Sequence, residues 1–214
     1  MYTNVWYVAA RSEELKDQPL YVQMLGADFV LFRDDKGNPA CLSNACPHRG
    51  DSLSNGSISD NGEIICPFHG WQFNRDGQCT KIPSIGDDDP QTAAPGVKVD
   101  AYPTIEKQGL IWAFLGDDPE SAKPIMDIPE LDDSQYAVIP YDVIFESNFH
   151  LAKFSNLDYV HLPIVHGIRF EDQENPYQPP PHTVEKTDYG MTAFIETEST
   201  YSKGAWSNVR EEGT

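Results

Sequence analysis

Residues 46–50 read CPHRG and residues 66–71 read CPFHGW, and these two stretches decide how the rest of the chain is interpreted. Each contains a cysteine, a histidine and a glycine, and a proline directly follows each cysteine. Proline stiffens such a loop, and glycine lets backbone amides approach a bound group. The two loops together offer two thiolates and two imidazoles to one metal centre. The candidate ligands are Cys46, His48, Cys66 and His69.

Two kinds of centre accept two cysteines and two histidines. Zinc binds such a set in one tetrahedral site. A Rieske [2Fe–2S] cluster places two cysteines on one iron and two histidines on the other. Zinc fingers keep the paired cysteines together and the paired histidines together, whereas each loop here combines one cysteine with one histidine. The arrangement favours the Rieske cluster over zinc, and over four unligated core residues.

The two loops resemble the ligand loops of Rieske proteins in spacing and in neighbouring residues. By that resemblance, Cys46 and Cys66 bind one cluster iron, and His48 and His69 bind the other.

High-potential respiratory Rieske proteins carry an extra cysteine in each loop, where this chain has Asp51 and Phe68. Trp71 replaces a hydroxyl residue of those proteins. Fewer hydrogen bonds to the cluster sulfurs predict a low potential, which suits electrons supplied by NAD(P)H through a reductase. The other cysteines, Cys41 and Cys79, lie in expected strands and are predicted to be core residues.

The composition sets limits on the class of protein. The chain has 214 residues, of which 39% are hydrophobic, and this is a globular composition. A formal net charge of −19 would repel phosphate backbones and argues against nucleic acid as a partner. No apolar run is long enough to predict a membrane span, and the start, MYTNVWYVAARSEEL, lacks the features of a signal peptide. We expect a cytoplasmic protein without disulfides.

The predicted fold is mainly β at first and mixed afterwards. Residues 1–120 are interpreted as an antiparallel, β-sandwich-like Rieske domain, in which FVLFR (29–33) and ACLSN (40–44) flank a hairpin turn. Residues 121–135, rich in proline and acid, are the expected linker. Residues 136–214 are interpreted as the N-terminal part of an α+β catalytic domain.

Three elements are expected in this second part. YAVIPYDVIFES (136–147) is a strand candidate. Residues 147–162 have apolar positions at helical spacing, with Ser147 or Asn148 as the cap. MTAFIETEST (191–200) is expected to form another strand.

The second candidate site begins on the expected helix with Asp158 and His161 and continues to His166, in the turn after the helix. His161 and His166, with a carboxylate from elsewhere in the protein, would form the facial triad of a non-haem Fe(II) oxygenase. Alone, such a pair is more often a surface or core feature, but the upstream Rieske loops favour a mononuclear iron site. Asp158 and His161 are three residues apart, which predicts that they share one face of the helix.

Over essentially its whole length the chain resembles the α subunit of Rieske non-haem iron oxygenases. The resemblance includes NVWYVAA (4–10) and NFHLAKFSNLDYVHLPIVH (148–166). The first segment is most similar to the monooxygenase and O-demethylase branch, which includes vanillate and dicamba demethylases. The family implies that His161 and His166 bind Fe(II), and that Asp158 bridges a cluster histidine of a neighbouring subunit to His161. Such a route requires a closed head-to-tail oligomer, commonly a homotrimer.

The activity implied is that of a terminal oxygenase. Electrons from NAD(P)H arrive through a reductase, with or without a ferredoxin, and O₂ is used to hydroxylate or demethylate an aromatic or other apolar small molecule, as in aromatic degradation. A ring cis-dihydroxylating dioxygenase, a Rieske ferredoxin-like electron carrier and a zinc-binding interaction module are the alternatives. The dioxygenase would differ in its products. The electron carrier would keep its activity after loss of His161, whereas an oxygenase would not. A zinc protein would be colourless, whereas a Rieske protein is red-brown.

The chain departs from the family pattern in three places. The family has an asparagine three or four residues before the aspartate, whereas this chain has Asn156 two residues before it. Pro163 is expected to end or kink the helix near Leu162. The third iron ligand, a carboxylate far towards the C-terminus in the family, is expected beyond Thr214. The nearer acids Glu171, Asp172 and Glu174 are not where the family draws it.

Overall fold

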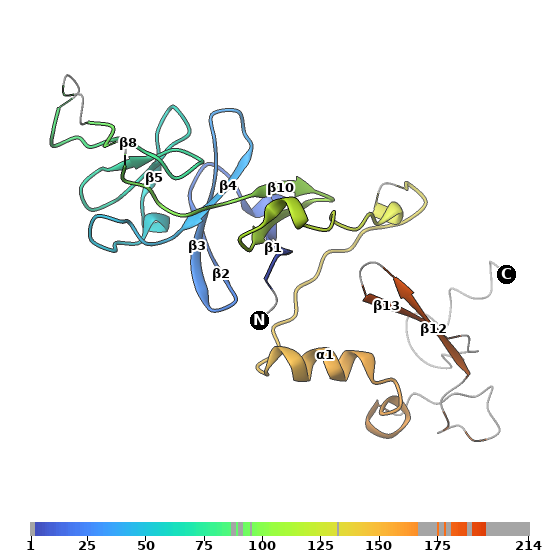
Figure 1. Cartoon of the computed structure of the whole chain (residues 1–214). Helices are drawn as coiled ribbons and strands as arrows, with labels where there is room; N and C mark the ends of the chain where they lie inside the picture. The colour runs from blue at the N-terminus through green and yellow to red at the C-terminus, as the bar shows by residue number, and fades with distance from the viewer. Residues whose placement is uncertain are drawn as a thin grey trace. The chain divides into compact units, whose positions relative to one another are not determined.

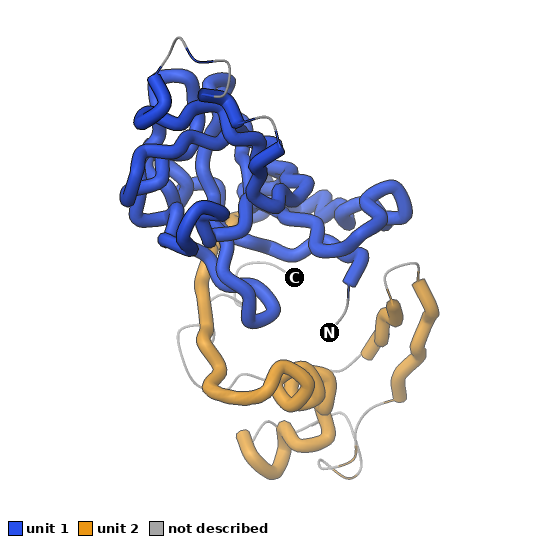
Figure 2. The backbone as a smooth tube through the Cα atoms, turned by 60° about the vertical axis from the view of Figure 1, so that its left-hand side comes forward, with its two compact units in different colours: residues 1–136 blue, residues 137–214 orange. Residues whose placement is uncertain are grey.

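The computed structural model describes residues 3–86, 89, 92–94, 96–131, 133–166, 175, 178, 181–187 and 190–195. The chain divides into two compact units, Met1–Tyr136 and Ala137–Thr214 (Figure 2). In the part of the chain that is described, no helix has the length and apolar character needed to cross a membrane.

The described residues of unit 1 form three antiparallel sheets (Figure 1). The first has the order β1–β11–β10, with bounds Val5–Arg11, Leu110–Leu115 and Thr104–Lys107. The second is β2–β3–β4–β9, with bounds Leu20–Met24, Ala27–Arg33, Pro39–Ser43 and Ala101–Tyr102. The third is β5–β6–β7–β8, with bounds Ser57–Ile58, Ile64–Ile65, Gln72–Phe73 and Cys79–Lys81. Single 3₁₀ turns cover Ser12–Glu14, Leu53–Asn55, Pro119–Ser121 and Pro129–Leu131. The predicted β-rich first half is confirmed.

Strand β3 is buried on both faces, which explains its continuous apolar sequence. Alternate residues of a strand point to opposite faces. Val30 and Phe32 pack into one core, and Phe29 and Leu31 pack into another. Figure 1 shows β3 and β4 between the β5–β8 region and the β1–β10 region. The second sheet is therefore the central layer of unit 1.

The two cores also account for the cysteines outside the ligand loops. Cys41, on β4, is fully buried in the core shared with β1 and β11. Burial raises the pKa of its thiol to about 12, so it stays protonated. Cys79, on β8, is buried in the core beneath the ligand loops. Both predictions, strand location and burial, are confirmed.

The predicted hairpin between β3 and β4 is also confirmed. The amide of Gly37 donates to the carbonyl of Asp34 at 2.9 Å, and the Asp34 carboxylate accepts from the Lys36 and Asn38 amides. A second tie runs from Arg33 to Glu106 on β10, where two nitrogen–oxygen contacts of 2.8 and 3.0 Å join the central sheet to the first sheet.

Among the described residues of unit 2, one α-helix is present, α1, Phe149–Leu157. Asn148 caps its start by accepting from the His150 amide at 2.9 Å, as one of the two predicted caps. A π-helical turn follows, labelled η5, Leu162–His166. Strands β12, His182–Thr187, and β13, Gly190–Ile195, form an antiparallel hairpin. The last five positions of the strand predicted over residues 191–200 lie outside the described residues.

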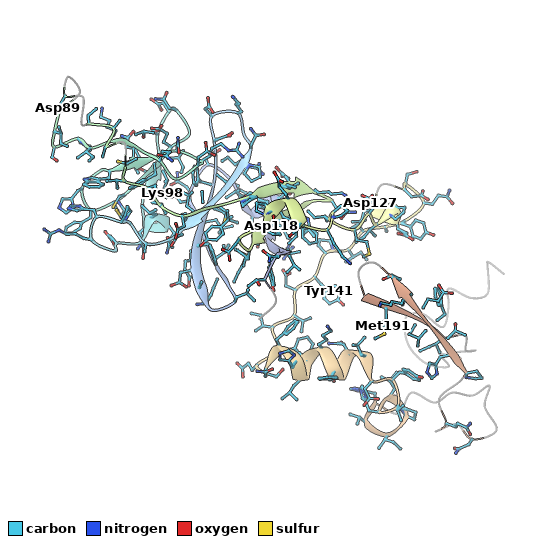
Figure 3. All side chains as sticks on the ribbon, in the orientation of Figure 1. Asp89, Lys98, Asp118, Asp127, Tyr141 and Met191 are labelled. Atoms are coloured by element: carbon cyan, nitrogen blue, oxygen red, sulfur yellow. The ribbon has the colours of Figure 1, made fainter. Side chains whose placement is uncertain are left out.

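The predicted strand over residues 136–147 is wrong. This segment is extended and exposed, and it pairs with no described strand. Tyr141 within it is 81% exposed (Figure 3). A strand needs a partner to satisfy its backbone groups, and none of the described segments supplies one.

The predicted helix over residues 147–162 ends early, at Leu157, where Asp158 adopts an extended conformation. Local side-chain bonds explain this end. The side-chain amide of Asn156 donates to the Ala152 carbonyl, and the Asp158 carboxylate accepts from the backbone amide of Val160. Asn and Asp side chains compete in this way with helical hydrogen bonds. Pro163 lies six residues after the helix ends at Leu157, so it is not the direct cause.

Candidate metal centres

The first ligand loop follows directly from β4 and is closed by two backbone hydrogen bonds. The Cys46 amide donates to the Asp51 carbonyl at 2.9 Å, and the Gly50 amide donates to the Cys46 carbonyl at 2.8 Å. Gly50 has a φ of 76°, in the left-handed region that glycine adopts without strain. The loop thereby carries the cysteine on its inner end and the histidine at its tip.

The second ligand loop repeats this backbone. The Cys66 amide donates to the Trp71 carbonyl at 2.8 Å, the Gly70 amide donates to the Cys66 carbonyl at 3.0 Å, and Gly70 has a φ of 73°. The two histidines nevertheless occupy different places, because His48 is the third residue of its loop and His69 is the fourth. The spacing that distinguishes the two motifs is therefore a one-residue offset on a shared loop geometry.

The two thiols lie together on the buried side of the loops. Cys46 and Cys66 are each 3% exposed, and the two thiols are close enough for Cys66 to affect the pKa of Cys46. Burial raises the pKa of the Cys46 thiol; the His48 amide opposes that shift, and the Cys66 thiol adds to it. A pair of buried thiolates is therefore unfavourable without a cation between them. Binding iron would supply that cation.

The two imidazoles lie together on the exposed side. The ring centroids of His48 and His69 are 4.8 Å apart. Trp71 stacks on His48, with centroids 4.5 Å apart and planes within 2°, and Phe68 lies against His69. Partial desolvation, then the charges of His69 and Arg49, lower the pKa of His48. A neutral imidazole is the form that binds a metal.

This separation of thiols from imidazoles is the test of which centre fits. Around a single zinc ion all four donors would converge. In the part of the chain that the structure describes, no three His, Cys, Asp or Glu side chains gather in that way. The four candidates instead form a thiol pair and an imidazole pair, as the two irons of a Rieske cluster require. The donor set fits the cluster.

Asn44 supports the first loop and was missed by the sequence analysis. It is the one buried polar residue recorded among the described residues, at 6% exposure. Its side-chain oxygen accepts from the Ser54 amide at 2.8 Å, and its carbonyl accepts from the Leu53 amide. An asparagine between strand β4 and the first ligand loop was the available signal.

The second candidate site follows the C-terminal end of α1. The ring centroids of His161 and His166 are 5.3 Å apart, and an Asp158 carboxylate oxygen lies 3.9 Å from Nδ1 of His161. The other oxygen of Asp158 accepts from the Val160 amide at 3.0 Å. The structure thus places His161 near both Asp158 and His166, by a turn, although the three side chains do not converge on one point as they stand. The prediction that Asp158 and His161 share a helix face is wrong, because the helix has ended before either residue.

These three side chains open onto a cavity of about 550 Å³. Four of its lining residues follow helical spacing on one face of α1 and its C-cap, namely Leu151, Phe154, Ser155 and Asp158. The turn adds His161, Val165 and His166. The cavity therefore combines an apolar wall with two imidazoles and a carboxylate.

The structure describes Asn156, but not the three acids that follow His166. Asn156 is exposed and donates to the Ala152 carbonyl 2.9 Å away, and it does not line the cavity. The acids Glu171, Asp172 and Glu174 lie outside the described residues.

Comparison with known proteins places these features in a family. Residues 5–103 match the Rieske [2Fe-2S] domain. Chlorophyllide a oxygenase of Chlamydomonas reinhardtii is 38% identical over 169 residues, which are 78% of this chain and 25% of that protein. The oxygenase component of dicamba O-demethylase of Stenotrophomonas maltophilia is 35% identical over 165 residues, which are 76% of this chain and 47% of that protein.

A solved structure, dicamba monooxygenase bound to dicamba, aligns with a TM-score of 0.74 at 29% identity, over 92% of this chain and 58% of that chain. The chain spans a quarter to a half of the length of the two named relatives. Residues 5–103 therefore form a Rieske [2Fe-2S] domain, and the similarity to oxygenase components of Rieske oxygenases extends well beyond this domain into Ala137–Thr214.

Proposed function

We propose that the protein is the terminal oxygenase component of a Rieske oxygenase system. The observation that carries this proposal is the presence of two donor sets in one chain. One is the Cys46–Cys66 and His48–His69 arrangement, and the other is the pair of histidines beside Asp158. An electron carrier has use only for the first set.

Each candidate ligand has a distinct role in this proposal. Cys46 and Cys66 hold one iron of a [2Fe–2S] cluster, and His48 and His69 hold the other. His161 and His166 hold a mononuclear Fe(II). When bound, the cluster supplies single electrons, and the Fe(II) supplies open positions where O₂ is activated.

Asp158 acts by orienting His161. The Val160 amide fixes one carboxylate oxygen, and the other faces Nδ1 of His161 at 3.9 Å. A carboxylate at that position favours the ring proton on Nδ1 and leaves Nε2 with its lone pair for a metal. In the assembled protein the same carboxylate is proposed to contact a cluster histidine of the next subunit.

The cavity indicates the kind of substrate. Leu151, Phe154 and Val165 give it an apolar wall, which favours an aromatic or other apolar small molecule and the exclusion of water during the reaction. Relatives named as an O-demethylase and as a chloroacetanilide N-alkylformylase support hydroxylation of a methyl or alkyl carbon. Monooxygenation followed by demethylation is therefore favoured over ring dihydroxylation.

Partners follow from the same proposal. The relatives are named as oxygenase components or subunits, which supports a separate reductase, fed by NAD(P)H, as the electron donor, with or without a ferredoxin. A head-to-tail homotrimer and a cytoplasmic location stay predictions.

The test removes one proposed iron ligand. His161→Ala in the iron-loaded protein should abolish substrate-dependent O₂ consumption and leave the electron paramagnetic resonance signal of the Rieske cluster unchanged. His150→Ala, on the exposed first turn of α1 and away from the cavity lining, is the matched control. Turnover that survives in His161→Ala would favour the electron carrier instead.

A further inference from the structure

The Tyr159 side chain is tied to a strand that the sequence did not connect with the candidate iron site. Its hydroxyl oxygen lies 2.7 Å from Nδ1 of His182, and the two rings meet edge to face with centroids 5.5 Å apart. This distance is that of a well-formed hydrogen bond. Either group can supply the proton, because a tyrosine hydroxyl and an imidazole nitrogen can each donate or accept.

The two ends of this bond differ in rigidity. Tyr159 stands between Asp158 and His161, in a turn where the α-helix has already ended. His182 is the first residue of β12, and its backbone pairs with Ile195 of β13 in a hydrogen-bonded ladder. The bond therefore fixes a short irregular segment to a regular one, 23 residues away in sequence.

The bond also lies outside the candidate site itself. Neither Tyr159 nor His182 lines the cavity formed by the two candidate ligands, Asp158 and the apolar wall. Any effect on that site must pass through the backbone of the Asp158–His166 segment. Such an effect is one of position, because neither side chain contacts the space where substrate would lie.

We propose that Tyr159 and His182 are a positioning pair, whose hydrogen bond holds the Asp158–His166 segment in the arrangement that brings His161 and His166 together. Ligands that are already held lose less conformational freedom when a metal binds. The role of the pair in iron binding rests on the proposed function, whereas its hold on the segment does not.

The first measurement needs no metal. Amide hydrogen exchange is followed at Val160, Ile164 and Val165, whose amides are hydrogen-bonded within the segment. Tyr159→Phe removes only the hydroxyl, and it should speed exchange at these amides by about threefold to tenfold, the scale of one hydrogen bond.

Two substitutions of His182 show whether the position of the hydrogen-bonding atom matters, or only the size of the side chain. In His182→Asn the side-chain oxygen lies near the former position of Nδ1, so exchange should return towards the unsubstituted rate. In His182→Gln the amide lies near the former Nε2 and should not restore it. Tyr141→Phe, which removes the hydroxyl of an 81% exposed tyrosine in the same unit, is the control and should leave exchange unchanged.

The second measurement is the affinity for Fe(II). It is followed in the cluster-loaded chain by the paramagnetic signal of the Fe(II)–nitric oxide adduct, with the Rieske signal as internal reference. Tyr159→Phe and His182→Gln should weaken Fe(II) binding by the same factor by which they speed amide exchange. His182→Asn should not weaken it.

Each measurement has its own outcome that would contradict the corresponding proposal. Unchanged exchange in Tyr159→Phe, or equal exchange in His182→Asn and His182→Gln, overturns the positioning pair. A protein that binds no Fe(II) at His161 and His166 when a third, carboxylate ligand is also present contradicts the proposed mononuclear site, and the exchange data alone then decide whether the pair holds the segment.

Discussion

Asp158 places one carboxylate oxygen 3.9 Å from Nδ1 of His161, although α1 ends at Leu157. The contact is made because the second oxygen is already held by the Val160 amide, which folds the chain back over a single turn. A continuous helix would also have placed the two residues near each other. The turn gives the same proximity and in addition directs the following residues into η5, so that His166 meets His161. Single π-helical turns of this kind are frequent at functional sites.

Asp158→Asn should keep the turn and lose the charge. The side-chain oxygen of asparagine can still accept from Val160, whereas the carboxylate that orients His161 is gone. We expect turnover or iron affinity to fall by about 10- to 100-fold, the usual cost of removing a partner of a metal-bound histidine. Substrate-dependent O₂ consumption and iron content measure the two effects, and the Rieske signal should persist. Full turnover in the variant would rule out this role for the carboxylate.

Cys66→Ala should abolish the cluster, because the remaining thiol and two imidazoles cannot complete the coordination of both irons. Cys79→Ala is a matched control, since Cys79 is buried in the same core and is not a candidate ligand. Iron and acid-labile sulfide content and the visible absorption spectrum distinguish the two variants. Loss of colour in Cys79→Ala but not in Cys66→Ala would require a different ligand set.

Asn44→Ala should destabilise the first ligand loop. The Ser54 amide would lose its acceptor in a largely buried position, which costs about 1–3 kcal/mol. We expect a lower free energy of unfolding and faster loss of the cluster. Asn55→Ala, an exposed position in the adjacent 3₁₀ turn, should change neither. Urea unfolding of the two variants, followed by tryptophan fluorescence, makes the comparison.

Glu106→Gln tests the tie between two sheets as a function of pH. The hydrogen bonds from Arg33, opposed in part by desolvation, hold the pKa of Glu106 below its usual value. The unfolded chain therefore binds a proton first as the pH falls, so this stabilisation is complete above about pH 4.3 and is lost as the pH falls through the lower folded pKa.

The free energy of unfolding of the unsubstituted protein should accordingly fall more steeply with acid than that of Glu106→Gln. Near neutral pH the variant should be the less stable of the two. Glu120→Gln, at an exposed 3₁₀ turn, serves as the control. Parallel slopes for all three proteins below about pH 4.3 would contradict the assigned pKa shift.

The sequence predicted those elements whose signal is local. The β3–β4 hairpin, the Asn148 cap and the buried strand positions of Cys41 and Cys79 follow from turn residues, capping preferences and apolar runs of a few residues. The strand predicted over residues 136–147 failed because its apolar residues indicate only a tendency to be buried. A strand also needs a neighbour, and the described residues supply none.

The candidate cluster ligands could be named from the sequence because each short loop combines one cysteine with one histidine, whereas His161 and His166 could be named only because those loops lie upstream. By itself, the sequence determined the donor set and the β-rich first half. Only the tertiary structure decided that the thiols meet on the buried side of the loops and the imidazoles on the exposed side, because that depends on two loops from different strands packing together. The link from Tyr159 to His182 was likewise beyond the sequence, since a contact across 23 residues has no periodicity to reveal it.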